Sequence, residues 1–260
     1  MLKAWTIAVL TFLVAPVVLL VPVALSSSSA LIFPPPGFSL RWFQTFFQNP
    51  QWLSSMFFSL RISLWVALLA TGLAILASFA LVRGSLRRQG AVYAIILAPL
   101  ITPEIIVAIA LYFIFARVHL VGTELAIILG QAVLALPVAT ILVSTTLQGL
   151  DVRTEQAAMV HGATPLRTFW LVTLPLLAPG VATAALFAFL GSFDELLVAL
   201  FMVGPLQQTL PVRIWDFVQF ELQPVIAAVS VMVTLLAITV LALGAWLQGR
   251  SSRSGAQDAR

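Results

Sequence analysis

The chain has 260 residues, of which 61% are hydrophobic and only 8% are charged. A soluble domain carries about 25% charged residues, so this composition excludes an ordinary soluble enzyme. The absence of Cys and the presence of only 2 His residues argue against a disulfide, a cysteine nucleophile or a metal site. The net charge of +4 fits a membrane protein with basic loops. It does not indicate a nucleic-acid partner, because the longest basic cluster is Arg87-Arg88.

Six apolar runs are each long enough to cross the ~30 Å hydrocarbon core of a bilayer as an α-helix, with membrane lipid around them. Helices are the expected form because lipid offers no partner to unpaired backbone groups. We therefore predict an all-α integral membrane protein, with one six-helix domain over 1–250 and a flexible cytoplasmic tail over 251–260. The predicted membrane helices are 5–25, 62–81, 93–115, 125–143, 179–202 and 225–247.

The distribution of Lys and Arg predicts the orientation of these helices. If both termini are cytoplasmic, most of the 13 basic residues lie inside, in agreement with the positive-inside rule. The inside residues are then Lys3, Arg83, Arg87, Arg88, Arg153, Arg167, Arg250, Arg253 and Arg260, and the outside residues are Arg41, Arg61, Arg117 and Arg213. Arg61 is expected at the outer start of its helix, where its side chain can reach the interface.

Two features of the first half of the chain lie near predicted helix ends or bends. The aromatic stretch 42–52 belongs to a long outer loop, and we expect it to lie along the membrane surface. Further on, Pro103 precedes Glu104 inside the third predicted helix, where the proline removes a backbone hydrogen bond and favours a kink. A kinked helix with a carboxylate can line a cavity, so Glu104 is a candidate pathway residue; an interface residue is the alternative.

The long cytoplasmic loop at about 148–174 has the local signals of two helices joined at a glycine. Asp151 or Thr154 can cap a helix that runs to Val160, and Gly162 suits the left-handed position at its end. Thr164-Pro165 is typical of a second helix start, with Thr as the N-cap and Pro in the first position. A connector needs only a few residues, so this structured elbow favours a docking role; a connector that caps the inner end of a bundle is the alternative.

The same loop resembles the EAA loop of permease subunits from binding-protein-dependent ABC importers. The resemblance rests on Gln156-Ala157-Ala158, Gly162-Ala163, Phe169, Val172, Leu174-Pro175-Leu176 and Pro179-Gly180. In that family the loop forms a coupling helix that seats in a groove of the cytoplasmic ATPase. The resemblance implies a coupling role here for Glu155, Gln156, Ala157, Ala158, Gly162, Ala163 and Pro165. Two positions depart from the family, because Gln156 replaces the usual Glu and His161 replaces a usually apolar residue.

A second resemblance covers most of the chain and concerns the polyamine-type branch of these importers, which contains the spermidine/putrescine permeases. It rests on Ser192-Phe193-Asp194-Glu195, Leu200-Phe201, Gly204-Pro205 and the segment 209–214. It implies the type I ABC importer permease (MetI-like) fold in a bacterial inner membrane. It also implies a small amine substrate, with a polyamine first and 4-aminobutyrate or an aminophosphonate as alternatives.

Asp194 and Glu195 are adjacent carboxylates inside the fifth predicted helix. A carboxylate facing lipid costs several kcal/mol, so both are expected to face protein or a watery cavity. They attract a cationic substrate in one interpretation. In the other they form a structural pair that caps a broken helix or binds Arg213 or a partner subunit. Trp215, in the last outer loop, can contact an ammonium group through its ring; an aromatic belt or a docking face for the binding protein is the alternative.

The leading functional prediction is a non-catalytic permease subunit of an ATP-driven importer. The chain has no G-x-x-x-x-G-K-[ST] pattern, so ATP and Mg²⁺ are expected on a partner ATPase dimer and no cofactor or metal on this chain. A second, different permease chain and an extracytoplasmic binding protein are the other expected partners. Two alternatives remain. The first is a stand-alone secondary transporter or channel, against which no inverted repeat is visible. The second is an intramembrane enzyme with an Asp194–Glu104 dyad.

Overall fold

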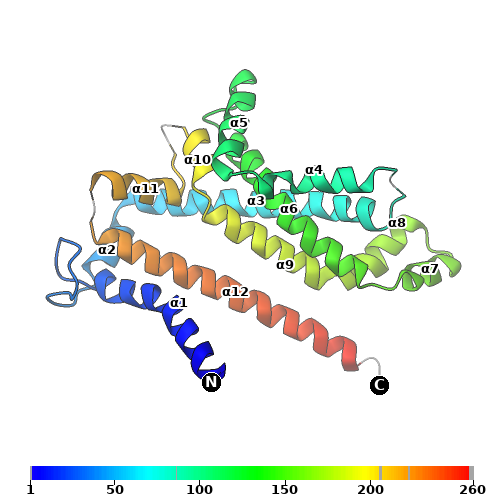
Figure 1. The fold of residues 1–260 in the computed structure, drawn as a ribbon, viewed down its shortest axis with the longest axis horizontal. Coiled ribbons are helices and arrows are strands. Elements are labelled where there is room, and N and C mark those ends of the chain that lie inside the picture. The colour runs from blue at the N-terminus through cyan, green and yellow to red at the C-terminus, as the bar shows by residue number, and fades with distance from the viewer. Residues whose placement is uncertain (1, 86, 205–206, 222, 258–260) are drawn as a thin grey trace. The chain divides into compact units, whose positions relative to one another are not determined.

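The computed structural model describes residues 2–85, 87–204, 207–221 and 223–257. Their regular structure is helical, apart from one isolated bridge between Ser26 and Phe38 (Figure 1). In the described part of the chain, five helices are long and apolar enough to span a membrane, and a bent pair can supply a sixth span. The predicted all-α membrane fold is therefore confirmed.

The chain divides into two compact units, and each is described by itself. Unit 1 consists of 1–58 and 207–240, and unit 2 consists of 59–206 and 241–260. The prediction of a single domain over 1–250 stays a prediction. Unit 1 holds three complete helices and the first parts of two long ones. The complete helices are α1 (Leu2–Ala24), α2 (Arg41–Gln48) and α11 (Leu210–Phe220), and the long ones are α3 (Pro50–Val82) and α12 (Val225–Gln257).

Aromatic side chains form the centre of unit 1. Phe46 and Trp52 are each only 1% exposed, and their ring centroids lie 6.1 Å apart. The Trp52 ring lies 4.7 Å from that of Phe217 on α11. Most of the stretch forms α2 and the first turn of α3, with Trp42, Phe46 and Trp52 buried in the unit and Phe47 60% exposed. The place of 42–52 along the membrane surface stays a prediction.

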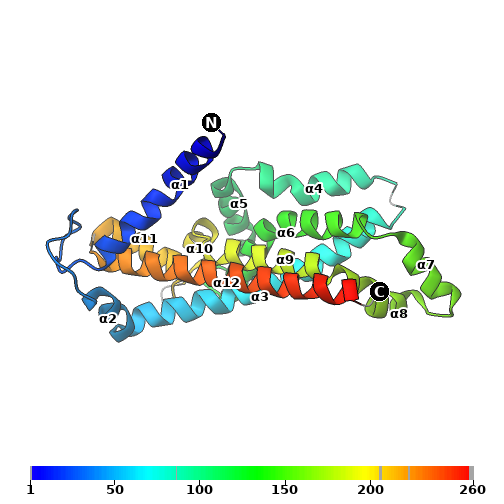
Figure 2. The same ribbon diagram turned by 90° about the horizontal axis from the view of Figure 1, so that it is seen from below.

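Unit 2 contains the remaining helices, and α6 (Glu124–Gln148) and α9 (Leu174–Phe193) lie side by side in both views (Figures 1 and 2). Small side chains line their shared core, among them Ala139 on α6 and Ala184 on α9, and such residues allow two membrane helices to approach closely. The other elements that lie wholly in this unit are α4 (Gln89–Ile101), α5 (Glu104–Arg117), α7 (Val152–Val160), α8 (Pro165–Thr168), the π-helix η1 (Phe169–Thr173) and α10 (Leu197–Met202).

The second predicted span is longer than expected. Helix α3 begins at Pro50, so Arg61 lies within the helix and not at its outer start. Its Nη2 atom lies 2.6 Å from Oε2 of Glu124 at the start of α6. The side chain thus has a charged partner on a neighbouring helix of unit 2 and is still 51% exposed, and its contact with the interface stays a prediction.

The third predicted span is two helices. Helices α4 and α5 meet at a bend of 106° across Thr102 and Pro103. Proline has no N–H to donate and disfavours a helical residue before it, and Thr102 is accordingly extended, with φ −79° and ψ 135°. The kink predicted at Pro103 is confirmed, in a sharper form that places Glu104 in the first turn of α5.

The fifth predicted span is displaced. A helical run long enough to cross a membrane covers Pro165–Phe193, and α10 starts separately at Leu197. Asp194 and Glu195 therefore lie at a break between α9 and α10 and not inside one helix. The physical reason is side-chain capping by Glu195, which is described below with the cavity.

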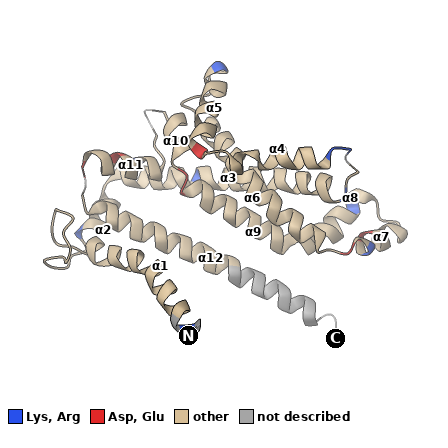
Figure 3. Cartoon of the chain, in the orientation of Figure 1, with Lys and Arg blue, Asp and Glu red and all other residues tan. Residues whose placement is uncertain are grey.

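Figure 3 shows Lys and Arg in the loop between α3 and α4 and around α7 and α8, and also at other places such as the far end of α5. Helix α12 continues through 251–257, which the sequence assigns to the tail. The last tail residues, 258–260, lie outside the described residues, as does Pro205 of the predicted Gly204-Pro205 motif. The orientation of the termini and the flexibility of the tail stay predictions.

Candidate functional site

The loop between α6 and α9 forms the predicted elbow. The Asp151 carboxylate accepts a hydrogen bond from the Arg153 N–H at 2.9 Å and so caps α7. Gly162 has φ +88°, the left-handed conformation that favours glycine at a helix end. Thr164 accepts a bond from the Arg167 N–H at 3.3 Å, with Pro165 at the start of α8. The predicted helix–glycine–helix geometry is confirmed.

Most of the residues with a predicted coupling role face outward from the elbow. The exposed ones are Gln156, Ala157, Gly162 and Pro165, and the half-buried ones are Ala158 and Ala163. Val160 at the end of α7 is 85% exposed, and Leu166 on α8 is 70% exposed. An exposed surface with apolar side chains of this kind suits a protein partner. The coupling role of these residues stays a prediction.

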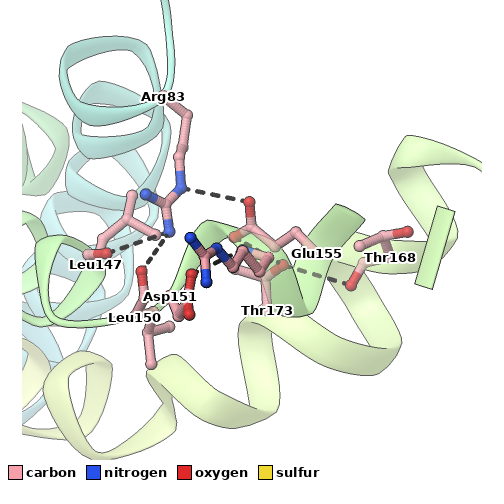
Figure 4. Close-up of polar contacts among 8 residues, drawn as sticks. Arg83, Leu147, Leu150, Asp151, Glu155, Thr168 and Thr173 are labelled. Atoms are coloured by element: carbon pink, nitrogen blue, oxygen red, sulfur yellow. Dashed lines mark hydrogen bonds and ion pairs between the residues drawn. The ribbon is translucent and has the colours of Figure 1, made fainter. Parts of the chain in front are cut away.

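Glu155 differs from the other coupling residues because its side chain points back toward the membrane helices (Figure 4). Its Oε2 atom lies 3.3 Å from Nε of Arg83, which follows α3, and the two side chains are only 15% and 21% exposed. Its Oε1 atom accepts a hydrogen bond from Thr173 Oγ1 at 3.3 Å. Arg83 and Thr173 are missing from the predicted site, because no local pattern connects either residue with α7.

Unit 2 also contains a cavity of about 670 Å³. Its polar lining comes from five residues, and Leu and Phe side chains contribute much of the remainder. The polar residues are Thr102 and Glu104 at the bend between α4 and α5, Gln131 on α6, Ser192 on α9 and Glu195 at the helix break. The structure thus brings Glu104 and Glu195 to one cavity, although they lie far apart in the sequence. Their role in a substrate pathway stays a prediction.

The buried Glu195 carboxylate holds the break between α9 and α10. Its Oε1 atom accepts a bond from the Val198 N–H at 2.5 Å, and its Oε2 atom accepts bonds from the Ala199 N–H at 3.1 Å and Gln131 Nε2 at 2.8 Å. The first N–H groups of a helix have no partner within the helix, so a carboxylate there stabilises the new start. This is the capping geometry that the sequence leaves open as an alternative, and it coexists with a place in the cavity wall.

Gln131 completes a polar chain across three helices of unit 2. Its Oε1 atom accepts a hydrogen bond from Ser192 Oγ at 2.6 Å, and Ser192 Oγ lies 3.3 Å from Ser63 Oγ on α3. Gln131 is 1% exposed. Sequence reasoning missed it because a lone glutamine in an apolar helix carries no motif, although its polarity inside a predicted span is itself a signal.

The other predicted site residues lie elsewhere. Asp194 is exposed, and it is absent from the described lining of the cavity.

Trp215 is 41% exposed on α11 of unit 1. Nearby Arg213, one of the partners considered for the two acids, donates to Ser55 Oγ at 2.9 Å and Gln51 Oε1 at 3.0 Å. Burial lowers the pKa of the Arg213 guanidinium, and the Asp216 carboxylate acts in the opposite direction. The described residues contain no group of three or more His, Asp and Glu that could hold a metal ion.

A bundle of membrane helices with an exposed cytoplasmic-type elbow and a cavity lined by carboxylates is the arrangement expected of a transport permease, and the comparison with known families identifies the same class. The family described as "Binding-protein-dependent transport system inner membrane component" matches residues 70–253. The chain therefore belongs to this family of integral membrane permeases, and the matched range includes the loop that resembles the EAA loop.

Individual relatives place the chain more closely. It is 32% identical to the putrescine transport system permease protein PotI of Escherichia coli, over 98% of this chain and 94% of that protein. It is 28% identical to the spermidine/putrescine transport system permease protein PotC of Haemophilus influenzae, over 80% of each. The predicted resemblance to permeases of the polyamine-type branch is therefore confirmed.

Solved structures agree on the fold. A bacterial ABC transporter that imports the acidic polysaccharide alginate matches with a TM-score of 0.72 at 14% identity, over 93% of each chain. The MetNI methionine ABC transporter in an inward-facing conformation matches with a TM-score of 0.63 at 17% identity, over 76% of this chain and 95% of that one. The fold is that of ABC importer permeases, as predicted.

Proposed function

We propose that this chain is the permease subunit of an ATP-driven importer for a small amine, with a polyamine such as putrescine or spermidine as the first candidate. The observation that carries the substrate class is the pair of carboxylates, Glu104 and Glu195, in the wall of one cavity. Glu195 is only 7% exposed, and a carboxylate near the low-dielectric interior attracts an ammonium group more strongly than one in bulk solvent, while the exposed Glu104 adds charge on the same cavity wall. The names of the relatives PotI and PotC, which are putrescine and spermidine/putrescine permeases, support the same class.

The energy for transport comes from other chains in this proposal. An ATPase dimer binds ATP and Mg²⁺, and the permease itself performs no catalysis. The outward face of the elbow, from Gln156 to Pro165, seats on that ATPase. A second, different permease chain completes the pathway, and an extracytoplasmic binding protein delivers the substrate. Both termini of this chain are cytoplasmic, in agreement with the bias of its basic residues.

The walls of the cavity suit a flexible diamine better than the alternative substrates. Its apolar part can cover a methylene chain, while Glu104 and Glu195 supply the charge. The substrates 4-aminobutyrate and an aminophosphonate also carry an anionic group, which the two carboxylates would repel. Asp194 and Trp215 remain proposed contributors along the pathway, Asp194 through its charge and Trp215 through its ring.

Purification and transport test this proposal in two steps. The chain is extracted gently from native membranes, and the chains that come with it are identified by mass spectrometry. The recovered complex is then reconstituted with its binding protein outside the vesicles and ATP inside, and uptake of radiolabelled putrescine is measured. We expect a P-loop ATPase, a second permease and ATP-dependent uptake that excess spermidine inhibits and succinate does not. Uptake driven by a proton gradient without an ATPase would favour a secondary transporter instead.

A further inference from the structure

Arg83 joins the ends of two membrane helices of unit 2. It follows the last residue of α3, and its N–H donates to the Phe79 carbonyl at 2.9 Å, so its backbone continues the helical turn. Its Nη2 atom donates to the carbonyl oxygens of Leu147 at 3.4 Å and Leu150 at 2.9 Å (Figure 4). The last carbonyls of a helix lack partners within it and carry a partial negative charge, so a guanidinium is favoured at the end of α6.

The same guanidinium also binds the elbow. Its Nε atom forms the ion pair with Glu155 of α7, and Glu155 in turn accepts the bond from Thr173 at the entry to α9. Next to this polar network, the ring of Phe79 lies 5.2 Å from that of Phe169 on η1 in an edge-to-face arrangement. One arginine side chain therefore connects α3, α6 and α7, and an aromatic contact supports the connection.

Helix α7 is otherwise held mainly at its surface, and Glu155 supplies its polar contacts with Arg83 and Thr173. None of its nine residues is buried, and Gln156, Ala157 and Val160 face outward. Gly162 follows it in a conformation with open space around the glycine, which offers the loop a flexible joint. A push on the outer face of an untethered α7 would bend the chain at this joint and move the membrane helices little.

We propose that Arg83 and Glu155 are positioning residues that latch the elbow to the ends of α3 and α6, so that movement of α7 moves these two helices as well. The proposal rests on the proposed function, because the partner ATPase is what would move the elbow. In this proposal the Glu155 carboxylate makes a contact within this chain, and the neutral, exposed Gln156 faces the partner ATPase.

The latch itself can be measured without any transport assay. The chain has no cysteine, so a single Val152→Cys substitution at the first residue of α7 places a spin label there, at an exposed position outside the Gln156–Pro165 face. The label is attached in the purified complex, with the cysteines of the partner chains replaced. We expect Arg83→Ala and Glu155→Gln each to increase the mobility of this label, and the double variant to add little to either change. Arg87→Ala, in the same loop and exposed, is the matched control. Unchanged mobility in both single variants would overturn the latch.

The coupling role needs a second readout from the same samples. In reconstituted vesicles we expect Arg83→Ala and Glu155→Gln to lower the amount of putrescine taken up per ATP hydrolysed by about fivefold or more. ATP hydrolysis and recovery of the partner chains should persist. A looser elbow with an unchanged ratio would reduce the pair to a structural contact and overturn the proposal. If the unmodified complex shows no ATP-driven uptake, the proposed function fails, and the label mobility still decides whether the latch exists.

Discussion

A Cβ atom added to Gly180 of α9 would lie 2.1 Å from the Oγ1 atom of Thr146 on α6. Thr146 has little freedom to move away, because this hydroxyl donates to the Leu142 carbonyl at 2.9 Å and its side chain is branched at Cβ. The two helices therefore cross with glycine as the contact surface on one side, in the manner of close-packed membrane helices.

This crossing predicts that Gly180→Ala destabilises the chain although the substitution adds only one methyl group. Forcing extra atoms into a packed contact costs about 1–3 kcal/mol. The matched control is Gly72→Ala on α3, where an added Cβ meets nothing within 4 Å and alanine is a better helix former. Thermal unfolding of the two purified variants in the same detergent compares them. Equal midpoints would show that α6 and α9 are farther apart than described.

The elbow predicts a different effect for its glycine. Gly162 has φ +88°, and a residue with a Cβ atom in the left-handed conformation costs about 1–2 kcal/mol. Because there is space around Gly162, Gly162→Ala should change the loop conformation without preventing membrane insertion, and putrescine uptake should fall several-fold. Gly90→Ala at the start of α4, where space is also open and φ is not positive, serves as the control. Normal uptake by the Gly162 variant would contradict the role of the elbow in coupling.

From the lining of the cavity we predict how strongly substitutions at Glu195, Glu104 and Asp194 reduce uptake relative to one another. Glu195→Gln should raise the putrescine concentration for half-maximal uptake by about tenfold, since a hydrogen bond to a charged group contributes about 1.5–3 kcal/mol. The amide oxygen of Gln can still accept from the Val198 N–H, so the cap of α10 is partly preserved. Glu104→Gln should act in the same direction, because the residue lines the same cavity. Asp194→Asn should have the smallest effect, since Asp194 lies outside the described lining of the cavity.

A ranking of this kind is measured from the concentration dependence of uptake in membranes with equal amounts of each variant. Glu195→Ala, which removes both the charge and the cap, separates the two roles of that residue. If Glu195→Gln transports normally and Glu195→Ala does not, the carboxylate serves the helix break and not the substrate.

The elbow was predictable from the sequence because its signals are local. Asp151, Gly162 and Thr164 each act on backbone groups within a few residues, and a single chain segment contains everything that such caps need. The ion pair of Glu155 with Arg83 was not predictable in this way. It joins a loop residue to the end of a distant helix, and that proximity depends on how α3 and α6 pack.

The break between α9 and α10 shows the same limit. Residues 179–202 are apolar enough to be read as one helix, and mean hydropathy alone does not place its end at Phe193. The break is stabilised by the Glu195 cap and by Gln131, which lies 64 residues away on α6. A buried charge inside a predicted span is therefore a reason to expect irregular backbone there.

In unit 1, we predict that replacement of Arg213 lowers the stability of the chain, although the sequence places this residue in an outer loop. Its guanidinium donates to Ser55 and Gln51 and lies 5.7 Å from the Trp52 ring centroid, so it ties α11 to the start of α3. Arg213→Ala should destabilise the chain by about 1–3 kcal/mol, because it also leaves the buried Ser55 hydroxyl without this donor. Arg213→Lys keeps the charge but lacks the planar fork that serves two acceptors, so it should restore only part of the loss. Thermal unfolding of both variants in detergent measures the difference, and a full rescue by lysine would show that charge alone matters at this position.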